Sequence, residues 1–314
     1  MPLYEQEFKE YLEDKLHPIG SVLQNPYRRE NLRTLFASRE EQGDLFGNPL
    51  DKLLDKLLEK TRVGMGLYSR WRQQIGSKER ELSVPIPPLN QFISGYLVYL
   101  INEISAHPNC HGGEENWSAR SSLESHLPVN AALSFDMENA FNNASVTLVF
   151  GFFYNLLEGR FEYYEERRDI AGFLSMICTV NYGNIRALPQ GSPASMPLFN
   201  RIMDPLDAEL TEATSRRGMA FSRWVDDFTV TSGNERQVED FLGAVDLVME
   251  KFPVAQKKVF FQNDGPIYLL GHKIVRGRIL KNSREEREMN KCPPLNFEYW
   301  FNGNKKYEQW RQNI

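Results

Sequence analysis

Two adjacent aspartates, Asp226 and Asp227, stand within the segment SRWVDDFTV at 222–230. Runs of β-prone and aromatic residues flank the pair on both sides, so we expect a hairpin that carries both carboxylates at its tip. Two carboxylates there, with a third from a neighbouring strand, could hold two divalent metals about 3.5–4 Å apart. An isolated Asp-Asp pair is usually a surface turn, and the metal interpretation therefore depends on a third carboxylate nearby.

That third carboxylate is offered by the segment LSFDMENAF at 133–141. Asp136 ends a short apolar run at 131–136, which we predict to be a strand. Phe141 follows closely, so a turn could bring its ring beside the metal site, where it would collide with the 2′ hydroxyl of a ribonucleotide. In the alternative interpretation, Phe141 is a core aromatic and Asp136 caps a helix.

A segment that contains glycine and two prolines, LPQGSPASMPLFN at 188–200, predicts a tight turn that enters a helix. A base pair could lie against the main chain of such a turn, with Gln190 placed to contact it. Taken alone, the segment could be any proline-rich loop that precedes a helix.

In this order and at these separations, SFDMENAF, LPQGSPASMPLFN and SRWVDDF resemble the fingers–palm domain of bacterial reverse transcriptases. RELSVPIPPL at 80–89 is similar to the fingers strand that contacts the nucleotide triphosphate in this family. YLLGHKI at 268–274 is similar to the primer-grip hairpin, and His126 stands ten residues before Asp136, as in many bacterial members. The resemblance extends over residues 78–274.

The resemblance implies an RNA-directed DNA polymerase, a nucleotidyltransferase that adds deoxynucleotides to a 3′ hydroxyl by two-metal catalysis. Its metal site would consist of Asp136, Met137, Asp226 and Asp227. The cofactors would be two Mg²⁺ ions, for which Mn²⁺ can substitute. One metal would lower the pKa of the attacking hydroxyl, and the other would stabilise pyrophosphate.

The resemblance also implies nucleotide- and primer-binding roles for a further set of residues. Arg80 and Lys78 would hold the phosphates, and Lys257 would be a general acid for the release of pyrophosphate. The remaining positions are Asn139 and Ala140 at the triphosphate and sugar, Phe141 as steric gate, Gln190 and Gly191 under the templating pair, and Leu270 and Gly271 near the primer end.

Several positions depart from the family pattern. Trp224 stands where the family more often has Tyr, and Met196 replaces a usual Pro. Retrons typically show Asn-Ala-x-x-His and Val-Thr-Gly, whereas this chain has LESH at 123–126 and LLG at 269–271. These departures favour the abortive-infection or other defence-associated enzymes, and with them a role in bacterial anti-phage defence.

The order of expected elements favours an α+β fold, with the fingers and palm of a right-hand polymerase, an antiparallel palm sheet and a reduced thumb. We divide the chain into an N-terminal helical region with the start of the fingers (1–77), fingers (78–130), palm (131–265) and a primer-grip hairpin with a minimal thumb (266–314). The expected helices are 3–16, 48–62, 90–104, two within 145–180 that break near 158–159, 195–215 and 236–252. The expected strands are 131–136, 219–224, 228–231, 256–262 and 266–279, and residues 78–89 are expected to form a strand or hairpin followed by a turn at three prolines. The leucine stripe of 48–62 is expected to be core packing rather than a seam for a partner.

The overall charge argues against a nucleic-acid binder, because the net charge is -5 and the pI is about 5.7. The charge is uneven, however. Residues 251–291 hold ten Lys and Arg against four acids, and residues 62–80 hold five against one. Two basic segments suit a cleft that follows phosphates, although they could also be solvated faces.

Three widely spaced cysteines form no recognisable zinc or disulfide framework. The N-terminus is charged throughout, and no apolar run approaches the length of a membrane span. These features predict a cytoplasmic setting without membrane association.

The expected partners are an RNA template, which we expect to be a structured noncoding RNA, the DNA product and deoxynucleoside triphosphates. A protein effector and a second copy of the chain are further candidates. Two alternatives stay open: a template-independent or protein-primed DNA polymerase, and a non-catalytic RNA-binding scaffold. The presence of all three aspartates and of Phe141 argues against the scaffold.

Overall fold

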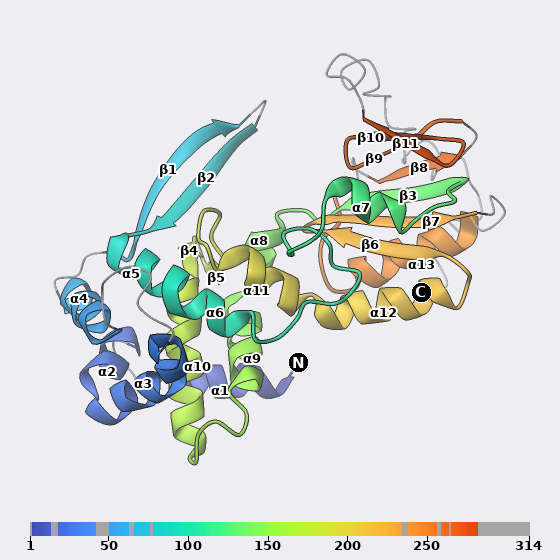
Figure 1. Cartoon of the computed structure of the whole chain (residues 1–314). Helices are drawn as coiled ribbons and strands as arrows, with labels where there is room; N and C mark the ends of the chain where they lie inside the picture. The colour runs from blue at the N-terminus through green and yellow to red at the C-terminus, as the bar shows by residue number, and fades with distance from the viewer. Residues whose placement is uncertain are drawn as a thin grey trace. The chain divides into compact units, whose positions relative to one another are not determined.

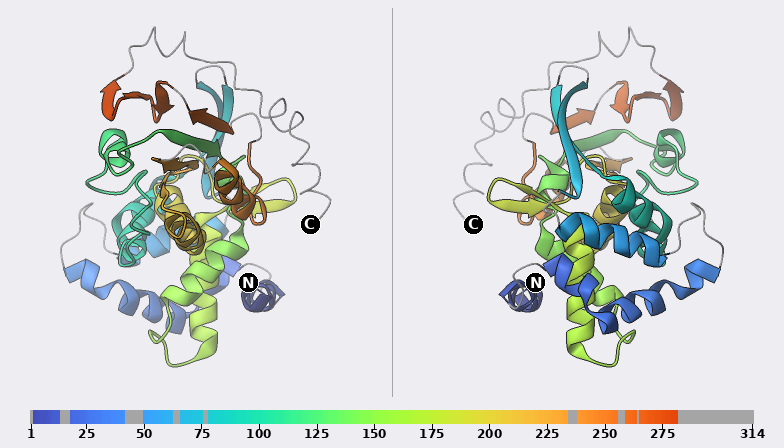
Figure 2. Two further views of the ribbon diagram at one scale, coloured as in Figure 1. Left: turned by 90° about the vertical axis from the view of Figure 1, so that its right-hand side faces the viewer. Right: turned by 90° about the vertical axis from the view of Figure 1, so that its left-hand side faces the viewer.

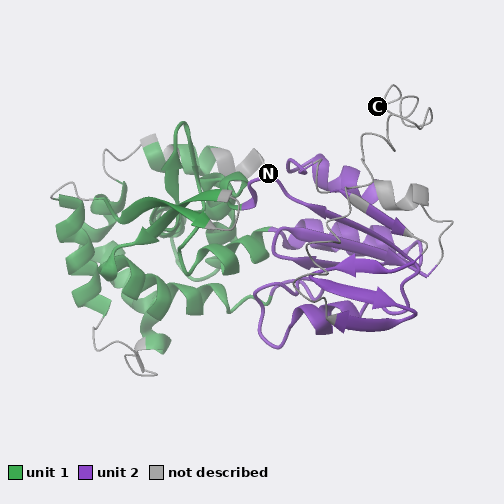
Figure 3. Cartoon of the chain, turned by 90° about the horizontal axis from the view of Figure 1, so that it is seen from above, with its two compact units in different colours: residues 1–105, 141–202 green, residues 106–140, 203–314 purple. Residues whose placement is uncertain are grey.

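The computed structural model describes residues 2–13, 18–41, 50–62, 66–75, 78–233, 238–255, 259–263 and 265–281. The chain forms two compact units that interleave along the sequence (Figure 3). Unit 1 consists of Met1–Ser105 and Phe141–Ile202, and unit 2 consists of Ala106–Ala140 and Met203–Ile314. The division into four consecutive segments stays a prediction.

Unit 1 is mainly helical. Its N-terminal helices are α1 (Pro2–Glu13), α2 (Pro18–Gln24), α3 (Pro26–Glu41) and α4 (Leu50–Arg62). They are followed by α5 (Pro87–Phe92), the π-helical turn η1 (Ile93–Leu97) and α6 (Val98–Ile101), and later by α8 (Ala140–Asn143), α9 (Val146–Leu156), α10 (Tyr164–Cys178) and α11 (Ser195–Ile202). Helices α9 and α10 lie side by side (Figures 1 and 2). No helix within the described ranges is long and apolar enough to cross a membrane.

The two β-hairpins of unit 1 are antiparallel. The longer one pairs β1 (Tyr68–Ile75) with β2 (Lys78–Pro85), and the shorter one pairs β4 (Val180–Tyr182) with β5 (Ile185–Ala187). Strand β2 confirms the strand expected from residue 78 onward. The turn expected at the prolines that follow is instead the start of helix α5 at Pro87, because proline is favoured at the first positions of a helix, where its missing N–H costs no bond.

Unit 2 is built on a four-stranded antiparallel sheet in the order β6-β7-β3-β8 (Figure 1). Its strands are β6 (Ala220–Trp224), β7 (Asp227–Ser232), β3 (Ala131–Asp136) and β8 (Phe260–Asn263). Helix α12 (Asp204–Ser215) packs on β6, and α13 (Val238–Met249) packs beside α12. The antiparallel palm sheet is confirmed, and α12 covers one of its faces.

The opposite face of this sheet is covered by helix α7 (Ala119–Glu124) and a small sheet in the order β11-β10-β9. The small sheet contains β9 (Ile267–Leu269), β10 (His272–Val275) and β11 (Arg278–Lys281). A buried cluster joins these layers through Leu123, Val129, Ala132, Ile267, Leu269, Ile274 and Ile279. The expected thumb would fall after this sheet, in residues that lie outside the described part of the chain.

Most of the expected helices are present, and one expectation is wrong. The pair within 145–180 breaks where it was expected, between α9 and α10. The single helix expected at 195–215 is instead two helices, α11 and α12, because Pro205 cannot continue α11 and is accommodated in the first turn of α12. Helices α2 and α3 and strand β1 were not expected from the sequence.

The leucine stripe of α4 is part of the core of unit 1. Leu50, Leu53, Leu54 and Leu57 are buried, whereas Leu58 is half-buried. We predict that Leu54→Ala lowers the free energy of unfolding by about 2–5 kcal/mol, because it leaves a cavity in the core.

Leu58→Ala is the matched control for this prediction, since it removes the same atoms from a half-buried position on the same helix. It should lower the free energy of unfolding by less than about 2 kcal/mol, as measured by urea denaturation. Equal small losses for both variants would mean that the stripe is not core packing.

Candidate active site

The register of the palm sheet brings the predicted carboxylates together. Asp136, the last residue of β3, pairs directly with Asp227, the first residue of β7. Trp224 pairs with Asp227 across the β6–β7 hairpin, so Val225 and Asp226 form its two-residue turn. The three aspartates therefore lie at one end of the sheet, and the alternative that Asp136 caps a helix is wrong.

Main-chain hydrogen bonds fix this end of the sheet. The N–H of Met137 donates to the carbonyl of Asp226 at 3.0 Å, which ties the end of β3 to the hairpin turn. The N–H of Ala255 donates to the carbonyl of Asp136 at 2.8 Å, and the N–H of Glu138 donates to the carbonyl of Pro253 at 2.8 Å. The backbone that carries the carboxylates is thus held from two sides.

The hairpin turn is strained at Val225, which has a φ of 59°. This left-handed region disfavours a β-branched residue, so the surrounding structure must hold it. Gly112 lies against the turn so closely that a Cβ there would come within 2.4 Å of the Val225 nitrogen. The loop before α7 thus supports the turn through a glycine, a contact that the sequence did not reveal.

The electrostatics of the site oppose the gathering of these carboxylates. Asp136 is buried, with 3% of its surface exposed. Asp227 is exposed at the hairpin, and neighbouring protein atoms remove part of the water around its carboxylate. This desolvation, together with the negative charge of Asp226, raises the pKa of Asp227 to about 6. A bound cation would relieve this repulsion.

The donor set suits divalent magnesium or manganese. Carboxylate oxygens are the ligands that these hard cations prefer. The thioether of Met137 is buried and is not a ligand for such ions, so Met137 could contribute only its main-chain carbonyl. No three His, Cys, Asp or Glu side chains among the described residues are already arranged around a cation position.

The predicted base-pair floor, Gln190 and Gly191, packs against strand β2 within unit 1. The N–H of Ser83 donates to the carbonyl of Gln190 at 2.7 Å. Gly191 has a φ of 112°, and a Cβ there would approach the Val84 side chain to 3.0 Å, so the turn requires glycine. The structure thus brings the fingers hairpin and the predicted floor together.

Arg80 and Lys78, the predicted phosphate-binding residues, belong to the same hairpin. Arg80 lies on β2 opposite Gln73, and its side chain is exposed. Lys78 lies opposite Ile75 at the far end of the strand pair. Both positions are on the strand that contacts the predicted floor, which is compatible with their predicted role.

The predicted steric gate, Phe141, begins the second stretch of unit 1. Its half-buried ring packs against Phe199 of α11, with the ring centroids 5.4 Å apart. This contact fits the core-aromatic interpretation in part, and the gate role stays a prediction. Of the two residues before it, Asn139 is exposed with a φ of 47°, and Ala140 is buried.

The primer-grip segment forms a hairpin in the structure. Leu269 pairs with His272, so Leu270 and Gly271 make the two-residue turn between β9 and β10. Both have positive φ, 46° and 71°, as a tight hairpin turn of this kind requires. Lys257, the predicted general acid, lies outside the described residues.

His126 supports the sheet rather than contacting the carboxylates. Its Nδ1 lies 2.8 Å from the Thr231 hydroxyl and its Nε2 lies 2.7 Å from the Ser222 hydroxyl, so the ring links β7 to β6. Burial, with a smaller effect of His111, lowers the pKa of His126 to about 4, and the ring is therefore neutral at physiological pH.

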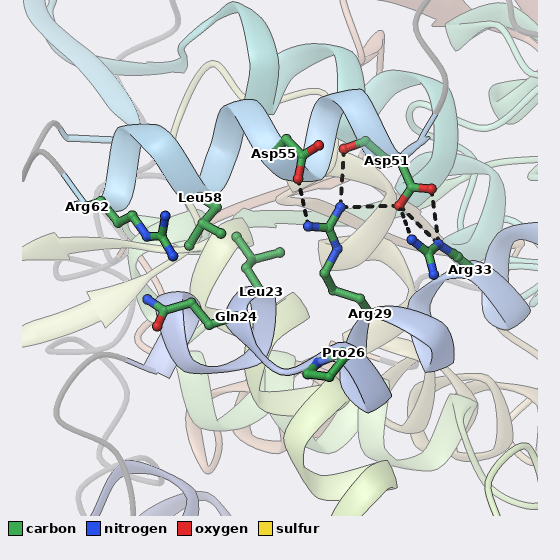
Figure 4. A pocket seen from close by; sticks show the side chains of 9 residues that line it. All are labelled: Leu23, Gln24, Pro26, Arg29, Arg33, Asp51, Asp55, Leu58 and Arg62. Carbon is green, nitrogen blue, oxygen red and sulfur yellow. Dashed lines mark hydrogen bonds and ion pairs between the residues drawn. The ribbon is translucent and has the colours of Figure 1, made fainter.

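A separate pocket of about 540 Å³ lies in unit 1 beside α2, α3 and α4 (Figure 4). Arg29 donates to Asp55 at 2.6 Å and to Asp51 at 3.2 Å, and Arg33 donates to Asp51 at 3.0 Å. These ion pairs link α3 to α4 and neutralise the two arginines. None of the residues predicted to be functional lines this pocket.

Comparison with protein families identifies a match over residues 88–274 to the model for reverse transcriptase (RNA-dependent DNA polymerase). This range covers more than half of the chain and contains all three aspartates. It also agrees closely with the range over which the sequence motifs resemble the family.

Two curated proteins are similar to the chain. The retron Ec86 reverse transcriptase of Escherichia coli is 30% identical over 182 residues, which cover 57% of this chain and 53% of that protein. The retron Mx162 reverse transcriptase of Myxococcus xanthus is 25% identical over 240 residues, which cover 72% of this chain and 48% of that protein. The chain spans about half the length of these relatives. Both are retron enzymes, whereas the motif departures favoured abortive-infection enzymes, and that finer assignment stays a prediction.

Solved structures of telomerases share the fold. Telomerase from Candida albicans, in complex with a TWJ fragment of telomeric RNA, gives a TM-score of 0.51 at 13% identity and covers 74% of this chain and 50% of that chain. Apo telomerase from Candida tropicalis gives a TM-score of 0.50 at 14% identity and covers 69% of this chain and 48% of that chain. At this level of identity the similarity shows the fold, which is that of a reverse-transcriptase palm and fingers.

The raised pKa of Asp227 generates a prediction about stability. A carboxyl whose pKa is higher in the folded than in the unfolded protein destabilises the fold as it ionises, so its contribution becomes unfavourable as the pH rises from about 4 to above 6. Asp227→Asn should therefore be more stable than wild type at about pH 7.5, by less than about 1 kcal/mol for so exposed a group, and the gain should vanish near pH 4.

Asp246→Asn on α13 provides the matched control, because burial and Glu250 raise the pKa of Asp246 to about 6 as well. In thermal unfolding experiments, both variants should be more stable than wild type at about pH 7.5, and this difference should vanish near pH 4. Mg²⁺ should raise the melting temperature of wild type and Asp246→Asn but have little effect on Asp227→Asn. An equal Mg²⁺ response in all three proteins would argue against a metal site at Asp227.

Proposed function

Because the chain belongs to the reverse transcriptase (RNA-dependent DNA polymerase) family, we propose that it extends a primer 3′ hydroxyl with deoxynucleotides copied from RNA. The observation that carries the proposal is the pairing of Asp136 with Asp227 across β3 and β7, with Asp226 in the adjoining turn. This arrangement supplies the three carboxylates that two-metal nucleotidyl transfer requires. Synthesis of DNA is favoured over synthesis of RNA because Phe141 would collide with the 2′ hydroxyl of an incoming ribonucleotide.

Each of the predicted site residues would have a distinct role in this reaction. Asp136, Asp226 and Asp227 would hold two Mg²⁺ ions, which when bound would lower the pKa of the 3′ hydroxyl and stabilise the pyrophosphate leaving group. Arg80 would bind the triphosphate from β2, and the main chain at Gln190 and Gly191 would support the templating base pair. Most of the rate enhancement would then come from positioning and electrostatics.

The template is proposed to be a structured noncoding RNA, and the biological role to be anti-phage defence. The two retron reverse transcriptases among the relatives are compatible with a specialised bacterial enzyme but do not identify its RNA. Sequencing of the nucleic acid that copurifies with the protein would identify the template. Plaque assays with wild type and a catalytic-site variant would test the defence role.

Primer extension tests the polymerase proposal directly. With an RNA template and Mg²⁺ or Mn²⁺, wild type should incorporate deoxynucleotides, and Asp226→Asn/Asp227→Asn should be at least about 1,000-fold slower. The loss is expected because the metals contribute several kcal/mol of transition-state stabilisation. Asp246→Asn/Glu250→Gln, which removes two interacting carboxylates from α13, should retain the wild-type rate.

Other outcomes distinguish the alternatives. Synthesis that does not depend on the template would favour a template-independent polymerase, and DNA bound covalently to the protein would favour protein priming. RNA binding that survives the double substitution, with no synthesis by wild type on its own copurified RNA, would favour the scaffold.

Phe141→Ala tests the steric gate. Removal of the ring should raise the kcat/KM for ribonucleotides relative to deoxynucleotides by about 10- to 100-fold, because the 2′ hydroxyl no longer meets the ring. Phe141→Tyr keeps the ring and should retain the discrimination. Unchanged rejection of ribonucleotides by a folded Phe141→Ala variant would leave Phe141 as a core aromatic that packs on Phe199.

A further inference from the structure

Arg223 is a fully buried cation directly beside the catalytic hairpin. It lies on β6, and the alternation of the sheet places it on the face with Phe228, opposite the face of Asp136 and Asp227. Its Nε and Nη2 donate to the two carboxylate oxygens of Asp207 on α12 at 2.8 and 2.6 Å. Both side chains are 0% exposed, so the pair is a desolvated, bidentate ion pair between the sheet and helix α12.

A third bond connects this ion pair to the catalytic turn. The Nη1 of Arg223 donates to the carbonyl of Val225 at 2.7 Å. That carbonyl belongs to the peptide that leads into Asp226, and Val225 is the strained residue of the turn. The guanidinium therefore holds the turn from one side, while Gly112 supports it through the main chain.

The main chain of Arg223 is fixed as well. Its carbonyl accepts the N–H groups of His111 at 2.8 Å and Gly112 at 3.3 Å, and its own N–H donates to the carbonyl of Asn109 at 2.8 Å. Arg223 thus links α12, the loop at 109–112 and the turn. A strained turn persists only when its surroundings determine it in this way.

We infer that Arg223, oriented by Asp207, is a positioning residue that fixes the Val225–Asp226 peptide so that the three carboxylates can bind metal. This inference rests on the proposed function. The planar guanidinium can donate to Asp207 and Val225 at the same time, whereas a lysine ammonium cannot reproduce this fork. The competing explanation is a buried ion pair that merely stabilises the fold.

Three variants separate these explanations. Arg223→Lys keeps the charge but loses the fork. Arg223→Met/Asp207→Leu replaces the ion pair by apolar side chains, which often restores stability, yet it removes the bond to Val225. The control is Arg28→Lys in unit 1, where Arg28 donates to Asp169 at 2.9 Å in another largely buried pair.

The measurements are melting temperature, primer-extension kcat and KM, and Mn²⁺ affinity from electron paramagnetic resonance. At a temperature where every protein is folded, Arg223→Lys and the double variant should lose about 100-fold in kcat with little change in the KM for deoxynucleotides. Their Mn²⁺ affinity should weaken by roughly 10- to 100-fold. Arg28→Lys should lower the melting temperature and leave kcat, KM and the Mn²⁺ affinity unchanged.

Recovery of both the melting temperature and kcat in the Met/Leu double variant would overturn the inference, and so would an Arg223→Lys variant that changes stability alone. Hydrogen exchange at residues 224–227 provides a readout that does not require synthesis. Exchange there should be faster in Arg223→Lys than in wild type, and Mn²⁺ should slow it less. If wild type makes no DNA, the polymerase proposal fails, while Mn²⁺ affinity and hydrogen exchange still decide the positioning role.

Discussion

The pairing register of β3 with β7 is the constraint on which the candidate site depends. It places Asp136 opposite Asp227 on one face and Phe135 opposite Phe228 on the other, where the two rings stack with centroids 4.9 Å apart. Because side chains alternate along a strand, a slip of one residue would turn a carboxylate into the helix-facing core and a phenylalanine onto the opposite face. The same aromatic packing that stabilises the sheet therefore also positions the chemistry, and the register is determined by the core.

This arrangement has an electrostatic cost that the fold has to offset. Desolvation, together with repulsion from the adjacent Asp226, raises the pKa of Asp227. The turn that carries Asp226 adds backbone strain at Val225. The opposing interactions lie outside the carboxylates themselves: main-chain bonds from Met137 and Ala255, and the buried pair of Arg223 with Asp207. Active sites commonly contain strained or unfavourable groups that interactions elsewhere in the fold compensate.

The elements that carry the aspartates could be predicted from the sequence because their signals are local. An apolar run that ends in Asp136 and two β-prone runs around Asp226 predict β3 and the β6–β7 hairpin by alternation alone. Strand β1 was missed because its sequence, YSRWRQQI, has no alternating apolar face. The pairing of Arg223 with Asp207 and the contact of Gly112 with Val225 join separate segments, so no spacing rule reveals them.

Under the proposed function, the residues for the chemical step and those that select the nucleotide belong to different units of the chain. The carboxylates and every contact that fixes their backbone belong to unit 2, whereas Arg80, Gln190 and Phe141 belong to unit 1. The chain crosses between the units at 105–106, at 140–141, shortly after Asp136, and at 202–203. Substitutions that share no contacts usually have additive effects. Under the proposed function, substitutions of Arg80, Gln190 or Phe141 should therefore change the choice of nucleotide, and substitutions that disturb the carboxylates should change the rate of the chemical step.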